Sequence, residues 1–286
     1  WRPLPLTVKE GRQFAGSIAS PPVESANPSM TTGQPLLEVT KLRFAYNGRH
    51  TLSDVDLSVA AGEAVALVGR NGAGKSTLLK CVVGLLRPQS GDVRVAGRSV
   101  RGRSVADICR EVGYLPQNAD DLLFSETVLD ELRVTLNNHR LPESSVDLDR
   151  LLERLGLSGV GENYPRDLSV GQRQRVALGA VTVTRPGLLL LDEPTRGLDA
   201  ATKASLVAIF RGWLDDGAAV LLVTHDVELA AMIADRTIML SGGEVIAAGP
   251  TREVLASSPH FAPQIARLFP HTGWLTPADV LKHVQK

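Results

Sequence analysis

One stretch near residue 70 constrains the fold more than any other part of the chain. The apolar run GEAVALVG (62–69) is typical of a short buried strand, and it leads directly into RNGAGKSTLLKCVVGLL (70–86), where apolar residues take helical spacing. Residues 69–77 match G-x-x-x-x-G-K-[ST], the pattern of a loop that binds phosphate between a strand and a helix. Gly72 and Gly74 let the backbone turn with its N–H groups pointing inward, and the following helix presents its positive end to the same anion. The stretch therefore predicts an α/β fold of the P-loop type.

Two side chains of this loop supply what a bound nucleotide needs. Lys75 offers a full positive charge to the β- and γ-phosphates, and Ser76 offers a hydroxyl to Mg²⁺. The strand–loop–helix context makes a chance match to the pattern a poor explanation. We therefore expect ATP or a similar triphosphate, with Mg²⁺, at residues 69–77.

Two further apolar strands end in polar residues. LLLLDE (188–193) ends in Asp192 and Glu193, and AAVLLVTHD (218–226) contains His225 near its end. Continuous apolar strands suit a parallel sheet covered by helices, and ligands gather at the carboxyl ends of such strands. We expect Asp192 to hold the metal, Glu193 to act as general base on a water molecule, and His225 to reach the γ-phosphate or that water. Taken alone, Glu193 would equally fit a solvated loop carboxylate and His225 a surface residue.

Together with LSVGQRQRVALG (168–179), these motifs resemble an ATP-binding-cassette (ABC) ATPase over residues 36–250. The resemblance implies a P-loop NTPase fold with a RecA-like core, an antiparallel β subdomain and an α-helical signature subdomain. It assigns ATP binding to Tyr46, which matches the aromatic residue that stacks on adenine, and to Gly69, Asn71, Gly72, Ala73, Gly74, Lys75, Ser76, Thr77, Gln117, Ser169, Gly171, Gln172 and Asp199. It assigns the metal ion to Ser76, Gln117 and Asp192, and catalysis to Glu193, His225 and Lys75.

The signature segment departs from the family pattern at one position. The usual sequence is LSGGQ, whereas Val170 stands at its first glycine, which puts in doubt any backbone geometry with positive φ there. Ser169 and Gly171, which approach the γ-phosphate in the family, are present. The resemblance also implies that two cassettes, identical or different, pair head to tail around ATP. Catalysis would then depend on association with a second cassette.

The stretch QNADDLLFSETVLDEL (117–132) distinguishes between classes of ABC ATPase. In ABC transporters this region contacts a coupling helix of the membrane subunit. Here it is most similar to the energy-coupling-factor (ECF) importers of vitamins, cobalt or nickel, whose typical pattern is Asn-Pro-Asp-x-Gln-Leu-Phe followed by Thr-Val and acidic residues. Ala119 replaces the proline of that pattern and Leu122 the glutamine. The residues that fit are Asn118, Asp120, Asp121, Leu123, Phe124, Thr127 and Val128.

Leu123 and Phe124 leave two interpretations open. They either anchor the helical subdomain on the core or face the coupling helix, and the two roles are compatible. Thr127-x-x-Asp130 is typical of a capping box at the start of the next helix. The apolar stripe of that helix favours subdomain core; it consists of Val128, Leu129, Leu132 and Leu136.

The chain is expected to divide into three parts. Residues 1–34 are rich in Pro, Ser, Gly and Thr and indicate a linker or disordered segment. Residues 35–250 form the cassette, with its helical subdomain at about 112–176, and residues 251–286 form a C-terminal helical extension. Within the extension, Thr276-Pro277 predicts a helix start.

The two ends of the chain carry weaker resemblances. LPLTVKEGR (4–12) resembles the connector between two fused cassettes, which implies that residues 1–286 are the C-terminal half of a tandem ATPase or that half's descendant. The chain begins with Trp1 and not Met, so we expect either that it was cut from something longer or that Met30 lies near a true start. FAPQIARLF (261–269) is similar to the segment in which two ECF ATPases meet. Both features favour pairing with a like cassette.

Composition and resemblance together bear on location and partners. Acidic and basic residues balance at 31 each, so the overall charge gives no sign of nucleic-acid binding. No apolar run is long enough to span a bilayer, and Cys81 sits in an apolar helical pattern typical of core. We expect a peripheral protein on the cytoplasmic face of the inner membrane, docked on an integral-membrane coupling subunit of an ECF importer. The alternatives are another type of ABC transporter or a non-transport ABC ATPase of translation or repair.

Overall fold

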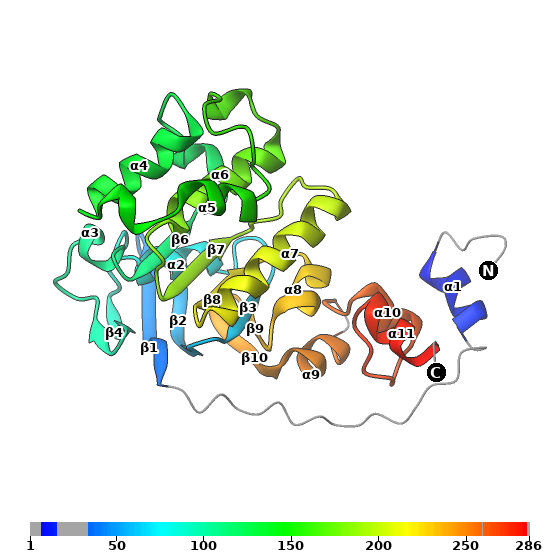
Figure 1. Cartoon of the computed structure of the whole chain (residues 1–286). Coiled ribbons are helices and arrows are strands. Elements are labelled where there is room, and N and C mark those ends of the chain that lie inside the picture. The colour runs from blue at the N-terminus through cyan, green and yellow to red at the C-terminus, as the bar shows by residue number, and fades with distance from the viewer. Residues whose placement is uncertain (1–6, 16–33, 259, 285–286) are drawn as a thin grey trace.

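Two β-sheets and the helices around them form the body of the molecule (Figure 1). The computed structural model describes residues 7–15, 34–258 and 260–284. Within these residues one sheet has the strand order β10-β9-β3-β8-β7-β6 and the other has the order β2-β1-β4-β5. The strands are β1 (Pro35–Tyr46), β2 (Arg49–Ala60), β3 (Ala64–Val68), β4 (Ser90–Val95), β5 (Arg98–Ser99), β6 (Val112–Leu115), β7 (Leu188–Asp192), β8 (Ala219–Val223), β9 (Arg236–Ser241) and β10 (Glu244–Pro250).

The sheet that contains β3 positions the site. Its strands pair in parallel, except that β10 runs antiparallel to β9. Alternate side chains of β7 enter different cores: Leu190 packs in the cluster shared with the second sheet, whereas Leu189 and Leu191 pack against helices on the opposite face. This two-sided burial explains the continuous apolar strands that the sequence shows, because neither face of the strand meets water.

The helix that follows the phosphate-binding loop lies between the two sheets. This helix is α2 (Lys75–Val82), and its Leu78, Leu79 and Cys81 share one core cluster with residues of both sheets. Burial raises the pKa of the Cys81 thiol to about 12, so the thiol stays protonated and behaves as a small apolar side chain. The core position predicted for Cys81 is confirmed.

The antiparallel sheet has a bulged first strand. The pairing of β1 with β2 contains register shifts, one of them between Val39 and Leu42, where Lys41 has φ 45°. A tight turn at Asn47 and Gly48, both at positive φ, joins β1 to β2. The strand β4, which pairs with β1, was not predicted, since SGDVRV is short and has Gly and Asp at its start.

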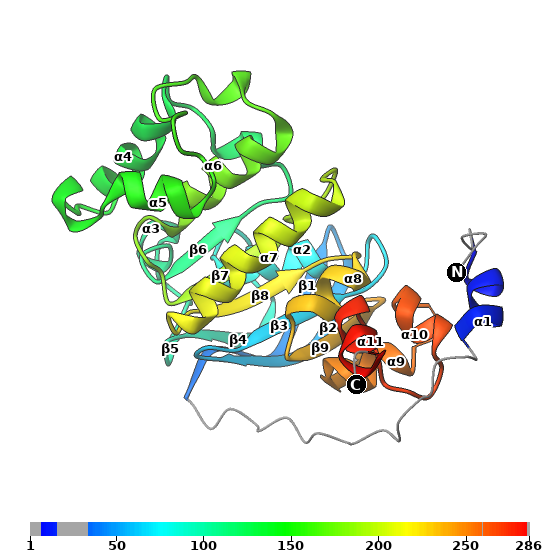
Figure 2. The ribbon, with the colours of Figure 1, turned by 45° about the vertical axis from the view of Figure 1, so that its right-hand side comes forward.

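The helices α4, α5 and α6 form a group beside the parallel sheet, as Figure 2 shows. The sequence predicts this helical subdomain at about 112–176, but Val112–Leu115 form β6 and pair with β7 as an edge of the parallel sheet. Four residues are too short a run for periodicity to separate strand from helix. The helices between β5 and β9 are α3 (Val105–Ile108), η1 (Ala119–Leu122), α4 (Val128–Asn138), η2 (Glu143–Ser145), α5 (Leu148–Arg154), η3 (Pro165–Asp167), α6 (Val170–Thr182), α7 (Ala200–Asp215) and α8 (Val227–Ile233).

The C-terminal extension is helical, as predicted. It contains α9 (Thr251–Ala256), α10 (Gln264–Leu268) and α11 (Pro277–Val284). The predicted start of α11 is confirmed, because Thr276 and Asp279 bond to each other's backbone N–H groups at 2.9 and 3.3 Å.

The first part of the chain differs from the expected linker. Val8–Ala15 form the helix α1, which lies against α10. Arg12 Nε donates to the carbonyl oxygen of Arg267 at 2.7 Å, and Ala15 shares a small apolar cluster with Trp274. A helix this short gains its stability from such packing rather than from its own sequence, which is why composition did not predict it. The other parts of the expected linker, residues 1–6 and 16–33, lie outside the described residues.

Leu123 and Phe124 point in opposite directions. Leu123 is 1% exposed and packs in the cluster around α4 and α6, whereas Phe124 is 78% exposed. The buried carboxylate of Glu131 on α4 fixes this arrangement, since it accepts the backbone N–H groups of Phe124 at 2.9 Å and Ser125 at 2.8 Å. The packing interpretation therefore holds for Leu123 and fails for Phe124.

The N-cap predicted for α4 is present, although the hydrogen bonds of the described residues include only one of the two bonds of a capping box. Thr127 is its N-cap, and the Thr127 hydroxyl accepts the backbone N–H of Asp130 at 3.0 Å. Of the apolar stripe predicted on this helix, Val128, Leu132 and Leu136 are fully buried. The cap and the buried stripe together fix α4, and hence Glu131, against the rest of the subdomain.

Replacing Leu123 and Phe124 separately by alanine should lower the free energy of unfolding by very different amounts. Leu123→Ala leaves a cavity in a closed core and is expected to lower the free energy of unfolding by about 2–4 kcal/mol. Phe124→Ala removes a solvent-exposed ring and is expected to change it by less than about 0.5 kcal/mol. Denaturant unfolding of both variants measures the difference, and similar losses would show that Phe124 is not exposed in solution.

Candidate functional site

A cavity of about 600 Å³ lies where the carboxyl ends of β3, β7 and β8 meet. Most residues that the sequence predicts for ATP, metal and catalysis line it or belong to the loop that forms its wall. Thr51 and Arg196 line it as well and were not predicted, although Arg196 lies directly between Glu193 and the predicted Asp199. The cavity is lined by Tyr46, Thr51, Asn71, Gly72, Gly74, Lys75, Ser76, Thr77, Gln117, Asp192, Glu193, Arg196 and His225.

Close packing of the backbone explains two of the glycines in the loop. A Cβ on Gly69 would lie 2.2 Å from the carbonyl oxygen of Leu240, and a Cβ on Gly74 would lie 2.7 Å from that of Thr51. Gly74 also has φ 104°, which L-residues rarely adopt. It is the N-cap of α2 and offers no side-chain cap, so the first N–H groups of the helix remain available to an anion.

Lys75 is a buried cation at the start of α2. Its Nζ donates to the carbonyl oxygens of Gly69 at 2.8 Å and Arg70 at 3.2 Å. Burial lowers the pKa of Lys75, while the nearby charges of Glu193 and Asp192 act in the opposite direction. A phosphate group in the cavity would add negative charge beside this ammonium group and so favour its charged form.

Asp192 and Ser76 form a donor set that fits Mg²⁺. Asp192 is 2% exposed, and its Oδ1 has no hydrogen-bond partner among the described residues. Burial raises the pKa of the same carboxylate while the Ser76 hydroxyl acts to lower it, and Ser76 and Gln117 both line the cavity. A buried carboxylate oxygen without a partner, a hydroxyl and an amide oxygen are the hard ligands that Mg²⁺ takes in proteins.

Glu193 and His225 contact each other at the cavity wall. His225 Nδ1 lies 2.7 Å from Glu193 Oε2, and the Thr224 hydroxyl and the His225 N–H both approach that oxygen at 3.3 Å. The Glu193 backbone has φ 51° and donates its N–H to the carbonyl oxygen of Val223 at 2.8 Å. Glu193 is therefore a positioned carboxylate and not a solvated loop residue, with His225 directly beside it.

The signature residues lie outside this cavity. Ser169 is the N-cap of α6, and it forms a reciprocal capping box with Gln172. Val170 is the first residue of α6 and is not at positive φ, so the departure at this position carries no backbone strain. Asp199 caps α7 by accepting the N–H of Thr202 at 2.7 Å. Ser169, Gly171, Gln172 and Asp199 are absent from the residues that line the nucleotide cavity.

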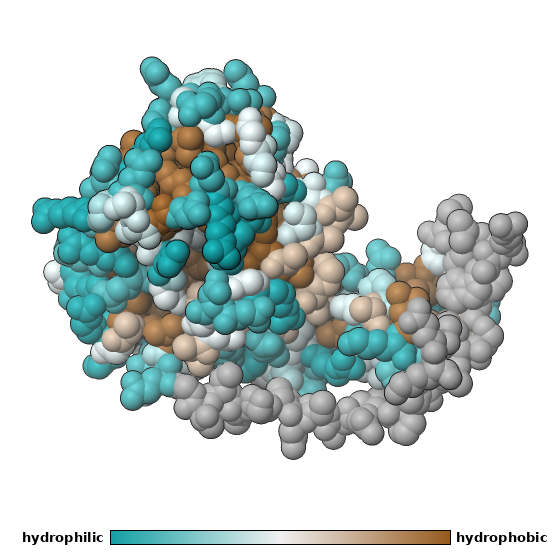
Figure 3. Space-filling model, in the orientation of Figure 1, coloured by the Kyte–Doolittle hydropathy of each residue, from teal (hydrophilic) through white to brown (hydrophobic). Residues whose placement is uncertain are grey.

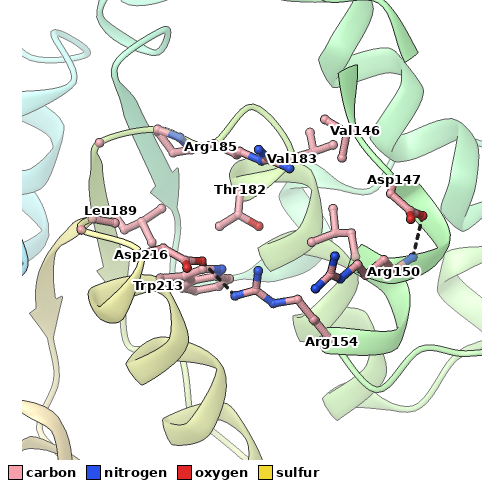
Figure 4. A pocket seen from close by; sticks show the side chains of 15 residues that line it. Val146, Asp147, Arg150, Arg154, Thr182, Val183, Arg185, Leu189, Trp213 and Asp216 are labelled. Atoms are coloured by element: carbon pink, nitrogen blue, oxygen red, sulfur yellow. Dashed lines mark hydrogen bonds and ion pairs between the residues drawn. The ribbon is translucent and has the colours of Figure 1, made fainter. Parts of the chain in front are cut away.

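A second cavity, of about 580 Å³, opens at the opposite end of β7 (Figure 4). Arg154 of α5 reaches across it to Asp216, at the end of α7, at a distance of 3.1 Å. Its floor is apolar and includes Trp213 and Leu189, and Figure 3 shows apolar residues gathered in the region of α5 and α6. None of the predicted site residues lines this cavity. This second cavity lies between the helical subdomain and the core, on the side away from the phosphate loop.

Comparison with known proteins identifies the family. The sequence profile of the ABC transporter family matches residues 52–196, which is about half of the chain. The chain belongs to the ABC transporter family of ATP-binding domains. The family hydrolyses ATP, and the P-loop fold with its buried Lys75 and Asp192 agrees with that assignment. No helix of the described residues has both the length and the apolarity needed to cross a membrane.

Relatives cover the chain over most of its length. A candidate ABC transporter ATP-binding protein of Streptomyces coelicolor is 42% identical over 98% of this chain, which corresponds to 55% of that relative. The chain thus spans about half the length of this curated relative. The solved structure of cbiO1 from Clostridium perfringens, described as part of the ABC transporter complex cbiONQ, is 30% identical, covers 78% of this chain and 91% of its own, and has a TM-score of 0.72. The structure of an ATP-binding subunit of an ABC transporter, 28% identical, covers 84% of this chain and all of its own with a TM-score of 0.71.

Without nucleotide and metal, Asp192→Asn should stabilise the protein at neutral pH. Burial raises the pKa of Asp192 in the folded chain, so the folded state binds this proton more tightly than the unfolded state and loses stability as pH rises through that pKa. Asparagine removes the charge, and its advantage should disappear below the ordinary carboxyl pKa of 3.8. Denaturant midpoints measured against pH test the expectation.

Asp226→Asn is the matched control. Burial acts to raise the pKa of Asp226, but hydrogen bonds from Lys203 and from the Leu229 backbone hold it below its usual value. The ionised carboxylate therefore contributes stability above pH 3.8, and Asp226→Asn should be less stable than the parent at neutral pH. An Asp192→Asn protein that is also less stable at neutral pH would contradict the expected cost of the buried charge.

Proposed function

We propose that the chain is the ATP-hydrolysing subunit of an ECF-type importer that takes up a vitamin or a transition-metal ion. The observation that carries the proposal is Phe124, an exposed aromatic side chain in the segment that follows Gln117 of the nucleotide cavity. The likeness of the fold to cbiO1, a component of a transporter complex, supports it. The sequence of residues 117–132 supports the ECF class within the family.

Hydrolysis follows from the arrangement of the cavity. The triphosphate would lie against the loop N–H groups and Lys75, with the adenine on Tyr46, whose ring packs edge-on against Phe44 at 4.7 Å. Asp192, Ser76 and Gln117 would hold Mg²⁺, which when bound neutralises charge on the phosphates. Glu193 accepts the proton of the attacking water, and His225 holds the Glu193 carboxylate from 2.7 Å away.

A second cassette is needed to complete the site. Ser169 and Gly171 lie outside this chain's own cavity, on an exposed helix start with Val170 54% exposed beside them. The capping box fixes the Ser169 hydroxyl at the positive end of α6, where it suits a phosphate of another molecule. Head-to-tail pairing would bring that helix end to the partner's γ-phosphate, and the partner's α6 to this one. The partner cassette is identical or a sibling.

The docking segment, residues 118–125, is the proposed contact with an integral-membrane coupling subunit. An exposed aromatic ring on a rigid support loses little conformational entropy on binding and buries a large apolar area. The support is rigid because Leu123 is buried in the core and the Glu131 carboxylate accepts the backbone N–H groups of Phe124 and Ser125. The protein would then be peripheral, on the cytoplasmic face of the membrane.

The domain division is part of the proposal. Residues 35–250 would form the cassette and 251–286 an extension that helps two cassettes to pair. The packing of α1 on α10 supports a role of α1 together with that extension. The half-length match to the Streptomyces relative is compatible with a second cassette in the same protein.

Glu193→Gln should abolish turnover and retain ATP binding. The amide keeps the size and the hydrogen-bond acceptor of the side chain but cannot take a proton from water. Turnover is expected to fall by at least about 100-fold, with an unchanged nucleotide dissociation constant and an ATP-stabilised pair of cassettes in size-exclusion chromatography. Hydrolysis at the parental rate would show that Glu193 is not the base.

Phe124→Ala should weaken attachment to the membrane subunit without affecting nucleotide binding. Ile246→Ala is the control, because Ile246 is also an exposed apolar residue, 62% accessible, but lies on β10. Co-purification of each variant with the coexpressed membrane subunit measures docking, and only Phe124→Ala should lose it. A parental chain that purifies instead with ribosomes or DNA would contradict the importer function.

A further inference from the structure

Arg173 joins two segments that have different roles. It lies on α6, one turn after the N-cap Ser169. Its Nε donates to Asp120 Oδ1 at 2.8 Å, and its Nη1 donates to the carbonyl oxygen of Leu168 at 2.8 Å. Asp120 belongs to the docking segment and Leu168 directly precedes Ser169. One guanidinium group therefore connects the docking segment to the residue before the signature serine.

The chemistry of the guanidinium suits this connection. Its N–H groups have fixed directions in one plane, so the carboxylate and the carbonyl are held in a set relation to each other. The Arg173 side chain is 22% exposed, and a partly buried, charge-assisted hydrogen bond is stronger than one in open water. Movement of Asp120 therefore acts on the start of α6 through these two hydrogen bonds.

The docking segment is held at its other end as well. Glu131 on α4 accepts the N–H groups of Phe124 and Ser125, and Leu123 is buried between these attachments. The segment is therefore fastened to α6 at Asp120 and to α4 at Phe124. A partner that displaces Phe124 acts on a short, tethered piece of chain rather than on a free loop.

Space for movement lies beside Arg173. A cavity of about 380 Å³ separates the docking segment and the start of α6 from Arg196 and Gly197. The amide nitrogen of Gln174, which lines this cavity, is buried and has no hydrogen-bond partner among the described residues. Gln117 lines both this cavity and the nucleotide cavity.

We propose that Arg173 is a positioning residue that couples the signature to the docking segment. ATP held at the signature by a second cassette changes the position of Asp120 through Arg173, and displacement of the docking segment changes the signature by the same contacts. The regulatory meaning of the coupling rests on the proposed function, in which the docking segment meets the membrane subunit. The coupling itself is a property of this chain and its paired copy.

Amide hydrogen exchange of the docking segment tests the coupling. In a Glu193→Gln background, which retains ATP, addition of ATP and Mg²⁺ should slow exchange at Phe124 and Ser125 by about tenfold. Adding Arg173→Gln should abolish this dependence on ATP. Arg173→Lys, whose ammonium group can still donate to Asp120 and to the Leu168 carbonyl, should restore part of it, which loss of fold alone would not allow.

Arg154→Gln in the same background is the matched control. Arg154 also joins the helical subdomain to the core by an ion pair, with Asp216 at 3.1 Å, but at the cavity away from the phosphate loop. This variant should keep the full effect of ATP on exchange. If Arg173→Gln does not fold, Asp120→Asn removes the same contact from the other side and should give the same loss.

Three outcomes would overturn the proposal: no effect of ATP on exchange in the Glu193→Gln chain, an undiminished effect in Arg173→Gln or Asp120→Asn, or an equal loss in Arg154→Gln. The result is separable from the proposed function. If ATP slows exchange and Arg173→Gln abolishes this effect in a chain that does not bind the membrane subunit, the coupling stands and the importer function is contradicted. If the chain docks through Phe124 but ATP has no effect on exchange, the importer function stands and the coupling is contradicted.

Discussion

Parallel pairing of β3, β8 and β7, with both faces of the strands buried, is the constraint on which the rest of the structure depends. Because both faces are apolar, polar side chains can stand only where a strand ends. The parallel arrangement places these ends at one edge, so Lys75, Asp192 and His225 come together although they are far apart in sequence. The site is thus a consequence of how the strands are buried.

The cavity holds charges that the folded chain alone does not satisfy. Lys75 bonds to backbone carbonyls, and Asp192 keeps one oxygen without a partner among the described residues. Burial shifts the pKa of each group toward its uncharged form. A triphosphate would pair with the Lys75 ammonium group and its cation with the Asp192 carboxylate. Binding would therefore offset the free-energy cost of burying these two charges in the fold.

The sequence predicted those parts of the fold and site that depend on local pattern. The phosphate loop, the three buried strands, the cap of α4 and the core position of Cys81 follow from neighbouring residues alone. β6 and α1 did not, because their stability comes from β7 and from α10, which lie far along the chain. Nor could pattern separate Leu123 from Phe124, since two adjacent apolar residues have the same local signal. Their opposite directions are set by Glu131, a buried carboxylate that hydropathy would assign to the surface.

Glu193 stands at φ 51°, a conformation that costs a non-glycine residue on the order of 1 kcal/mol or more. The N–H bond to Val223 and the bonds that converge on its carboxylate hold it there. Glycine would adopt the same backbone without this steric cost, but it has no carboxylate. The backbone and the chemistry therefore make opposite demands on a single residue.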